Sequence, residues 1–199
     1  MKMIREEKPK RGYHFICANH TTGKHNLAVS VGDVRHAEGK IVLCENGLHW
    51  CKTAFDALEY APGPVLCEVE AWGETVSDAT KSVSSYRRCL SIRDVSAELE
   101  EFACLCAERG LRRERKAGRE PDPASWNVID AKRMWLEGHI TDDELRAAWA
   151  AATPAAEAAW ADAAPAAAWA ARAADRRWQK RTFRKLLSPR PAKGIDGGG

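Results

Sequence analysis

The chain has 199 residues, of which 45% are hydrophobic, so it is long enough for one domain with a core of its own plus an extension. No apolar run approaches the roughly 20 residues that a membrane span needs, and the charged N-terminus lacks the apolar stretch of a signal peptide. We therefore expect a cytoplasmic protein rather than a secreted or membrane-spanning one, and we expect its seven cysteines to be reduced thiols.

The formal net charge of +3 conceals an asymmetry along the chain. Residues 170–199 contain nine Lys and Arg against two Asp, so only this C-terminal part is basic. Any electrostatic attraction to phosphate groups is therefore expected there.

We predict an α+β protein, with a small N-terminal mixed sheet and two helices followed by a helical region rich in Ala and Trp. The expected parts are a flexible arm over residues 1–11, the small α+β domain over 12–110, a linker over 111–124, a helical region over 125–187 and a disordered tail over 188–199. The linker is expected because Gly110 is a natural helix stop and the segment after it is basic and contains Gly and Pro.

The densest local signal lies between residues 39 and 72. Ile41–Cys44 is an apolar run before an Asn-Gly pair, which predicts a strand and then a sharp turn. Thr53 is placed to cap a helix by accepting from a backbone N–H near residue 56, and Pro62 ends that helix. Residues 39–62 are therefore expected to form a strand, a turn and a short helix, in that order.

A second strand follows, in which apolar and acidic residues alternate. Glu68 and Glu70 share one face of it, while the valines between and beside them point the other way. The polar segment 77–85 is expected to be a loop or a ragged strand edge, and Tyr86–Arg93 a further strand.

Three pieces of this region, Leu43–His49, Asp56–Gly63 and Val65–Glu70, together resemble a domain of unknown function found in many phage and prophage proteins. The similarity extends over residues 10–107. It implies a small α+β domain, an origin in a mobile element, a place in the cytoplasm of an infected or lysogenic bacterial cell, and no settled activity.

The second half is expected to be helical. Thr141–Glu144 has the sequence of a capping box and predicts a helix start. Pro154 suits the first turn of a new helix, and Pro165 marks a kink or a further break. Because alanine buries little area, most apolar contact here must come from four tryptophans. These are Trp149, Trp160, Trp169 and Trp178.

Five residues are candidates for a catalytic site: His14, His49, Tyr60, Glu68 and Glu70. Their layout is similar to that of ADP-ribosyltransferase-like folds, which implies NAD as the cofactor and a glutamate that stabilises positive charge as a glycosidic bond breaks. The chain departs from that layout because it has no Ser-Thr-Ser element. The plainer interpretations are that His49 ties down its turn by a backbone hydrogen bond and that the glutamates lie on a solvated strand face.

Cys44, His49, Cys51 and Cys67 are possible soft metal ligands, but their spacing is irregular and contains no Cys-x-x-Cys pair. We predict no metal site.

The last predicted helix, which ends near Leu187, has a basic face. Its cations are Arg177, Lys180, Arg181 and Arg184. Together with Trp178 and Phe183 they are candidates for contact with the phosphates of nucleic acid, and the alternative is an ordinary solvated helix face.

Three functions fit these patterns. We favour a phage-type accessory protein that acts as a non-catalytic interaction module without a cofactor, binds a host or phage protein, and associates with itself through Trp149 and Trp160. The alternatives are an NAD-using or other nucleotide-binding enzyme, and a protein that binds nucleic acid weakly through the basic helix.

Overall fold

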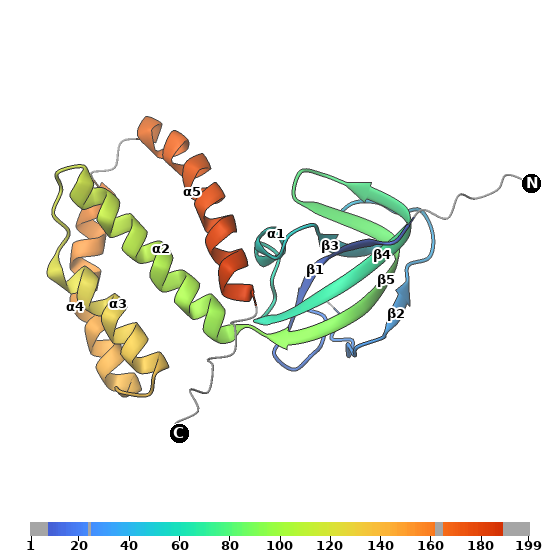
Figure 1. Cartoon of the computed structure of the whole chain (residues 1–199), viewed down its shortest axis with the longest axis horizontal. Helices are drawn as coiled ribbons and strands as arrows, with labels where there is room; N and C mark the ends of the chain where they lie inside the picture. The colour runs from blue at the N-terminus through green and yellow to red at the C-terminus, as the bar shows by residue number, and fades with distance from the viewer. Residues whose placement is uncertain (1–7, 24, 162–164, 189–199) are drawn as a thin grey trace, which may run out of the picture.

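The computed structural model describes residues 8–23, 25–161 and 165–188, without the side chains of residues 153–174. It consists of a small sheet with one short helix and a group of long helices beside it (Figure 1). The predicted α+β class, with a helical region after the sheet, is confirmed.

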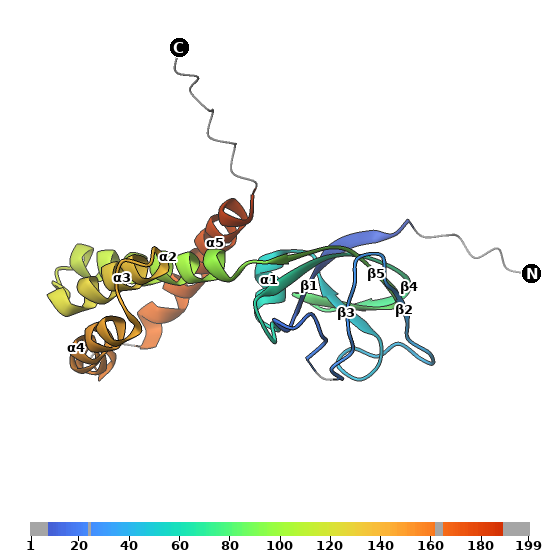
Figure 2. The same cartoon turned by 90° about the horizontal axis from the view of Figure 1, so that it is seen from below.

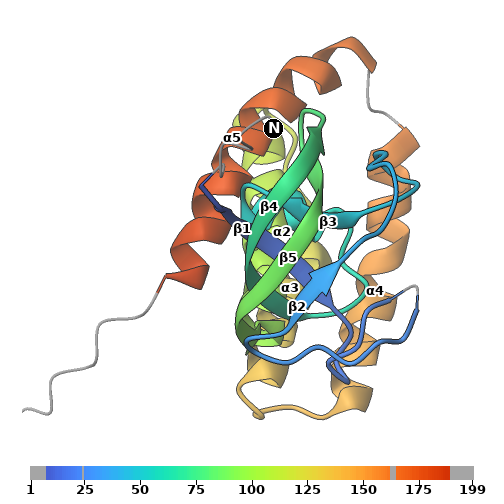
Figure 3. The ribbon, with the colours of Figure 1, turned by 90° about the vertical axis from the view of Figure 1, so that its right-hand side faces the viewer.

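Five strands form the sheet: β1 (Lys10–Ile16), β2 (Val34–His36), β3 (Leu48–Cys51), β4 (Val65–Ser77) and β5 (Lys81–Asp94). Their order is β2-β5-β3-β1-β4, and β4 also pairs with β5. This last pairing closes β5, β3, β1 and β4 into a ring, so the sheet is a small barrel with β2 added along β5 (Figure 3). All pairings between these strands are antiparallel, where we expected a mixed sheet.

Trp50 fills the centre of the barrel. It is 2% exposed, and its indole Nε1 donates to Ser84 Oγ at 2.9 Å. A Cβ on Gly12 would lie 2.4 Å from the Trp50 ring, so a larger residue there would displace the indole. The apolar residues around Trp50 are Ile16, Val29, Val65, Cys67, Val69, Ala71 and Cys89.

Strands β4 and β5 form one long hairpin, so the loop or ragged edge expected over residues 77–85 is wrong except for the turn at residues 78–80. Asp78 closes the hairpin turn, because its Oδ1 accepts from the backbone N–H groups of residues 80 and 81 at 2.8 Å each. Ser82 and Ser84 are buried, and their hydroxyls bond to those of Ser77 and Thr75 across the hairpin. The serines that suggested a loop therefore satisfy one another within the sheet.

The strand expected at Ile41–Cys44 is not found in the described part of the chain. Val42 forms an isolated bridge with Asn46, and the chain turns at Gly47 with a φ of 124°. A Cβ on Gly47 would also lie 2.4 Å from the side chain of Val83, so glycine is needed there for space as well as for its φ. The strand of this unit is β3, which follows the turn instead of preceding it.

Helix α1 (Ala54–Leu58) starts as predicted. The hydroxyl of Thr53 accepts from the backbone N–H of Asp56 at 3.1 Å. The same hydroxyl donates to Asp56 Oδ2 at 2.6 Å, which orients the carboxylate toward the start of the helix. The central unit is therefore β3–α1–β4.

The remaining helices are α2 (Ser96–Lys116), α3 (Pro123–Leu136), α4 (Asp142–Ala161) and α5 (Pro165–Leu187). Helix α2 continues through Gly110, so the stop and the linker start that we expected there are wrong. A mid-helix glycine costs about 1 kcal/mol, which tertiary contacts can outweigh. Leu111 packs against the cluster formed with α3 and α4, and Arg109 and Arg113 both pair with Asp175 of α5.

The capping box at the start of α4 is confirmed. The backbone N–H of Thr141 donates to Glu144 Oε2 at 2.7 Å, and that of Glu144 donates to Thr141 Oγ1 at 3.3 Å. Helix α4 runs through Pro154 instead of ending before it, whereas α5 begins at Pro165. Within the described residues, no helix is long and apolar enough to cross a membrane.

Some predicted segments lie partly or wholly outside the residues that the structure describes. Lys10 and Arg11 belong to β1 and not to a flexible arm. Residues 1–7 of that arm, the tail after Ser188 and the side chains of Trp160 and Trp169 lie outside the described residues.

Helix α5 runs back from the helical group and packs against the barrel beside α1 (Figures 1 and 2). Phe183 is its anchor: the side chain is 0% exposed, and its ring centroid lies 5.1 Å from that of Phe102 and 6.4 Å from that of Phe55. These rings join Phe15 and Leu66 of the barrel wall in one core cluster. The phosphate contact considered for Phe183 is therefore wrong.

We predict that Phe183→Ala lowers the free energy of unfolding by about 3–5 kcal/mol, because it leaves a cavity between α5 and the barrel. Denaturant unfolding followed by tryptophan fluorescence measures this loss. Met134→Ala, at an exposed position of α3, is the control and should change stability by less than about 0.5 kcal/mol. Equal stability of the two variants would show that α5 is not anchored through this ring.

Candidate functional site

A groove of about 580 Å³ lies between the outer wall of the barrel and helix α5. Its size is within the range of small-ligand and side-chain pockets. Its walls come from β1 (Tyr13), α1 (Ala54, Phe55), β4 (Leu66, Glu68), β5 (Ser91, Ile92, Arg93), and α5 with the residue after it (Lys180, Phe183, Arg184, Leu187, Ser188). No single stretch of sequence contains this site.

The inner part of the groove is aromatic and aliphatic. Phe55 and Phe183 meet edge to face, and Tyr13 and Leu187 pack against the same cluster. Buried aromatic and aliphatic surface of this kind contributes most of the free energy when an apolar group binds.

A buried ion pair holds α5 at the groove. Lys180 Nζ lies 2.8 Å from Asp56 Oδ1 and 2.9 Å from Asp56 Oδ2, and Arg176 lies 3.4 Å from Oδ1. Burial alone would raise the pKa of Asp56, but the hydrogen bonds from Lys180 and Thr53 outweigh it and hold the pKa below its usual value. The carboxylate is therefore charged at neutral pH and fixes the position of α5.

Two charged residues at the groove have no ion-pair partner among the described residues. Arg184 projects from α5 and Glu68 from the outer wall of β4, and both are exposed. Arg93 differs from them, because it donates to the carbonyl oxygen of Leu187 at 3.0 Å and lies 3.5 Å from Glu98. The charges left to meet a ligand are thus mainly those of Arg184 and Glu68.

Of the five catalytic candidates, only Glu68 lies in this groove. Glu70 is next but one on β4, and its carboxylate lies 3.9 Å from Arg88. Strand pairing explains why Glu68 does not meet His14: Glu68 is opposite Tyr13, and His14 is opposite Cys67. Successive residues of a strand point to opposite faces, so Glu68 is outside the barrel wall and His14 is inside it.

His49 holds its own turn in place. Its Nε2 accepts from the backbone N–H of Cys44 at 3.2 Å, and Cys44 adopts a φ of 68°. A positive φ is uncommon for a residue with a side chain, and this bond helps to offset its cost. The plainer interpretation of His49, that it ties down its turn, is the one that the geometry favours.

Tyr60 lies beside the turn of the β4–β5 hairpin and does not line the groove. Its hydroxyl lies 2.9 Å from Thr80 Oγ1, and Lys81 Nζ lies 4.7 Å from the centre of its ring. A hydrogen bond with the Cys44 side chain raises the pKa of Lys81. Lys81 therefore connects Tyr60 with the turn that His49 holds. The structure therefore distributes the five candidates over the groove, the outer wall, the turn end and the barrel interior.

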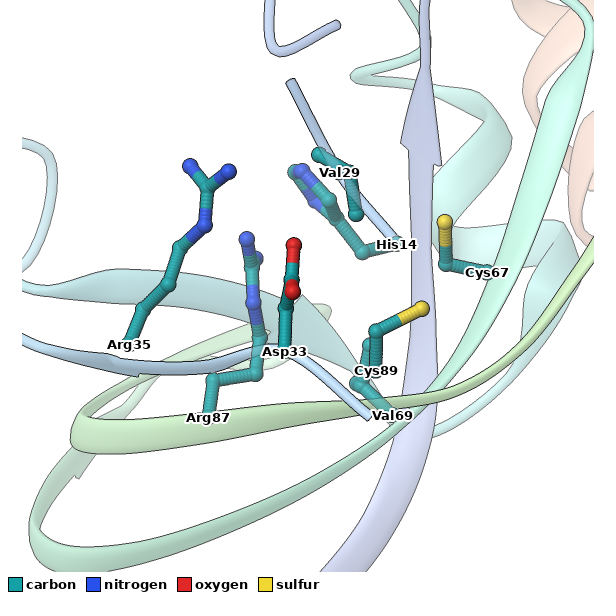
Figure 4. A pocket seen from close by; sticks show the side chains of 8 residues that line it. All are labelled: His14, Val29, Asp33, Arg35, Cys67, Val69, Arg87 and Cys89. Atoms are coloured by element: carbon teal, nitrogen blue, oxygen red, sulfur yellow. The ribbon is translucent and has the colours of Figure 1, made fainter. Parts of the chain in front are cut away.

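His14 lines a second, much smaller pocket inside the mouth of the barrel (Figure 4). Burial, then the charges of Arg87, His49 and Arg35, lower the pKa of His14 well below its usual value. The imidazole is therefore neutral at neutral pH. Across the residues that the structure describes, no group of three or more His, Cys, Asp or Glu is arranged to hold a metal.

The four cations of the basic helix do not act as one face. Lys180 is bound to Asp56, and Arg184 lines the groove. Arg177 and Arg181 are exposed on α5 and have no ion-pair partner in the described part of the chain. Trp178 is covered by Arg109, whose guanidinium lies 4.6 Å from the centre of the ring.

The sequence analysis did not identify Asp56 or Arg87 as site residues, nor the role of Phe183 as an anchor. For Asp56 a signal was present, since Thr53-x-x-Asp56 has the spacing of a helix cap whose acidic residue binds nearby donors. For Phe183 the signal was its position three residues after Lys180, which places both on one side of a helix. Arg87 gave no local signal, because it is one of two adjacent arginines.

Residues 10–99 match the model of a domain of unknown function, DUF7666. The match covers the barrel, α1 and the first residues of α2, which is slightly less than half of the chain. No curated protein and no solved structure matches the chain. Helix α5, which forms one wall of the groove, lies outside the matched residues.

We predict that Asp56→Asn destabilises the protein by about 1–3 kcal/mol at neutral pH, because Lys180 loses its buried partner. A carboxylate whose pKa is lowered on folding stabilises the folded state above its unfolded-state pKa. That contribution disappears as the pH falls through the lower, folded-state value.

The free energy of unfolding of the wild type should therefore decrease as the pH is lowered below about 4. Asp56→Asn should lack the part of this decrease that comes from protonation of Asp56. Denaturant titrations at several pH values measure both effects. Asp130→Asn, at an exposed position of α3, is the control with the same change of charge. Parallel pH profiles for wild type and Asp56→Asn would contradict the assignment.

Proposed function

With residues 10–99 identified as a DUF7666 domain, we propose that this chain is a non-catalytic interaction module that binds a protein partner in the groove between the barrel and α5. The observation that carries this proposal is the groove itself, with its aromatic interior and the unpaired charges at its edge. The mobile-element origin that the sequence similarity implies belongs to the same proposal: the partner is a phage or host protein in a bacterial cytoplasm.

The chemistry of the groove favours a peptide segment with an apolar anchor. A volume of about 580 Å³ accommodates one or two large side chains. Anchor residues that fill such pockets contribute most of the free energy at protein interfaces, and the surrounding contacts exclude water. A Leu or Phe side chain packed against Phe55 and Phe183 fits this description.

The charged residues of the groove determine which peptide residues can lie beside the apolar anchor. Three cations, Arg93, Lys180 and Arg184, line the groove against the single carboxylate of Glu68. Lys180 already neutralises Asp56, but Arg184 has no acidic partner among the described residues. An acidic residue beside the anchor would pair with Arg184, which improves specificity and association rate more than affinity.

Self-association is a further part of the proposal. Trp149 of α4 is 55% exposed, and large exposed aromatic side chains favour protein contacts. Trp160, the second residue proposed for this contact, has no described side chain.

We predict that Ser91→Trp, which fills the groove from β5, weakens binding of a short labelled peptide with a central Leu-Phe pair flanked by Glu. The loss should be tenfold or more, equivalent to about 1.4 kcal/mol. Fluorescence anisotropy measures it. Ala79→Trp, on the exposed hairpin turn away from the groove, is the matched control and should bind as wild type does.

A peptide flanked by Lys instead of Glu tests the charge argument and should bind more weakly to the wild-type protein. The proposal fails if Ser91→Trp and Ala79→Trp bind alike, or if the Lys-flanked peptide is preferred.

One observation favours nucleic-acid binding as a second function. Arg177, Arg181 and Arg184 follow one another at helical spacing on α5, all are exposed, and no acidic residue of the described part pairs with them. Such a cationic stripe can neutralise phosphates and release their counterions. No comparable observation favours the NAD-using alternative, because its five residues are dispersed over the described structure.

We predict that Arg177→Gln with Arg181→Gln lowers the slope of log affinity against log salt by about 2 units for duplex DNA, close to 0.9 per lost phosphate contact. Arg112→Gln with Arg146→Gln removes the same charge at exposed sites elsewhere and should leave the slope unchanged. If wild-type binding is insensitive to salt, or the two double variants lose equal slope, the stripe does not bind nucleic acid.

A further inference from the structure

The mouth of the barrel contains a small polar pocket that the groove does not include (Figure 4). It lies between the strands β1, β4 and β5 and the chain from Val29 into β2, and its volume of about 10 Å³ is at the lower limit for one water-sized group. Its polar lining residues are His14, Asp33, Arg35, Cys67, Arg87 and Cys89. The side chains of Arg35 and Arg87 lie alongside each other at one side of the pocket (Figure 4).

Arg87 is a charge inside the barrel. Only 7% of the residue is exposed, and its guanidinium donates to the carbonyl oxygen of His49. No carboxylate among the described residues lies within ion-pair distance of it. Burial, followed by the charge of Arg35, lowers the pKa of Arg87 to about 10, so the group is still cationic at neutral pH.

Arg35 adds a second positive charge at the outer side of the same pocket. Its guanidinium donates to the carbonyl oxygen of Ala28, and it too has no carboxylate at ion-pair distance in the described structure. Asp33 is the one acid that lines the pocket, and its Oδ2 accepts from the backbone N–H of Ser30 at 2.7 Å. The nearest acid is therefore fixed by the loop instead of neutralising either arginine.

The two thiols that line the pocket form a hydrogen-bonded pair. A hydrogen bond with Cys89, and then burial, raise the pKa of Cys67, so that thiol stays protonated. The hydrogen bond from Cys67 lowers the pKa of Cys89, and Arg87 lowers it further. The Cys89 sulfur is in addition directed at the carbonyl oxygen of Ser91 at 3.6 Å.

A buried cation without an acidic partner is costly, whereas one that meets an anion forms short, charge-assisted hydrogen bonds. We propose that the barrel mouth is a binding site for an anionic oxygen group, a phosphate or a carboxylate, that Arg87 and Arg35 hold together. One oxygen occupies the pocket beside Arg87 and the neutral imidazole of His14. The rest of the group lies outside it, against Arg35, because the pocket has room for one such atom only.

The test titrates the full-length, isotope-labelled chain with inorganic phosphate and, separately, with acetate, and follows the ring signals of His14 by NMR. Sodium chloride at equal ionic strength is the reference for non-specific screening. We expect saturable shifts of the His14 signals and a rise in the pKa of His14 when the anion binds, because a nearby negative charge favours the imidazolium.

Arg35→Gln removes one of the two cations from the less buried position and should weaken binding about tenfold or more. Arg87→Gln should abolish it, with circular dichroism as the check on folding. Arg88→Gln is the matched control: it is the next residue on β5, but its side chain lies outside the barrel wall, near Glu70 and over the ring of Trp72.

Saturation with phosphate, with acetate or with both, lost in Arg35→Gln and kept in Arg88→Gln, supports the site and identifies its preferred anion. The absence of saturable shifts with either anion overturns the proposal. Equal weakening in Arg35→Gln and Arg88→Gln overturns it as well, because the effect would then be one of general charge. The result for the Ser91→Trp variant does not bear on anion binding, because Ser91 lines the groove on the outer wall and not the pocket at the barrel mouth.

Discussion

The Asp56 carboxylate joins two parts of the chain that are more than a hundred residues apart. Helix α1 has only five residues and would not be stable in isolation. Its buried carboxylate, already bonded to Thr53, requires a cation, and Lys180 of α5 supplies it. Phe183, less than one helical turn later, completes the contact through the aromatic cluster. The groove exists because this contact places α5 against the barrel wall.

The closed barrel imposes the second constraint, since each strand residue faces either the interior or the outer wall. His14 and Cys67 are opposite each other inside, and Tyr13 and Glu68 outside. Pairing of β1 with β4 brings His14 and Glu68 to adjacent positions of the sheet, but their side chains lie on opposite sides of the wall. The same alternation gives the protein two distinct sites, one on the outer wall and one in the mouth, without any residue in common.

Sequence alone was sufficient where the signal is local. The Thr53 cap, the Thr141–Glu144 capping box and the alternation over residues 65–70 depend on neighbours within a few positions, and all three are present. The sequence was insufficient where a residue's conformation depends on a contact with a residue far away in the chain. Burial of Ser84 depends on the Trp50 indole, and continuation of α2 through Gly110 depends on contacts with α3 and α5. The groove could not be predicted for the same reason.

Arg87 and Arg88 are adjacent on β5, but their side chains lie in opposite environments. Arg88 lies outside the wall, where Glu70 offsets its charge and Trp72 covers its guanidinium. Arg87 points into the barrel, where an apolar residue of similar volume would be more stable than an unpaired cation. Proteins retain such destabilising groups chiefly where function requires them. Among the described residues no carboxylate lies within ion-pair distance of Arg87, and Asp33, the acid of the pocket, is bonded to its own loop. This is the physical reason to assign the barrel mouth to an external anion.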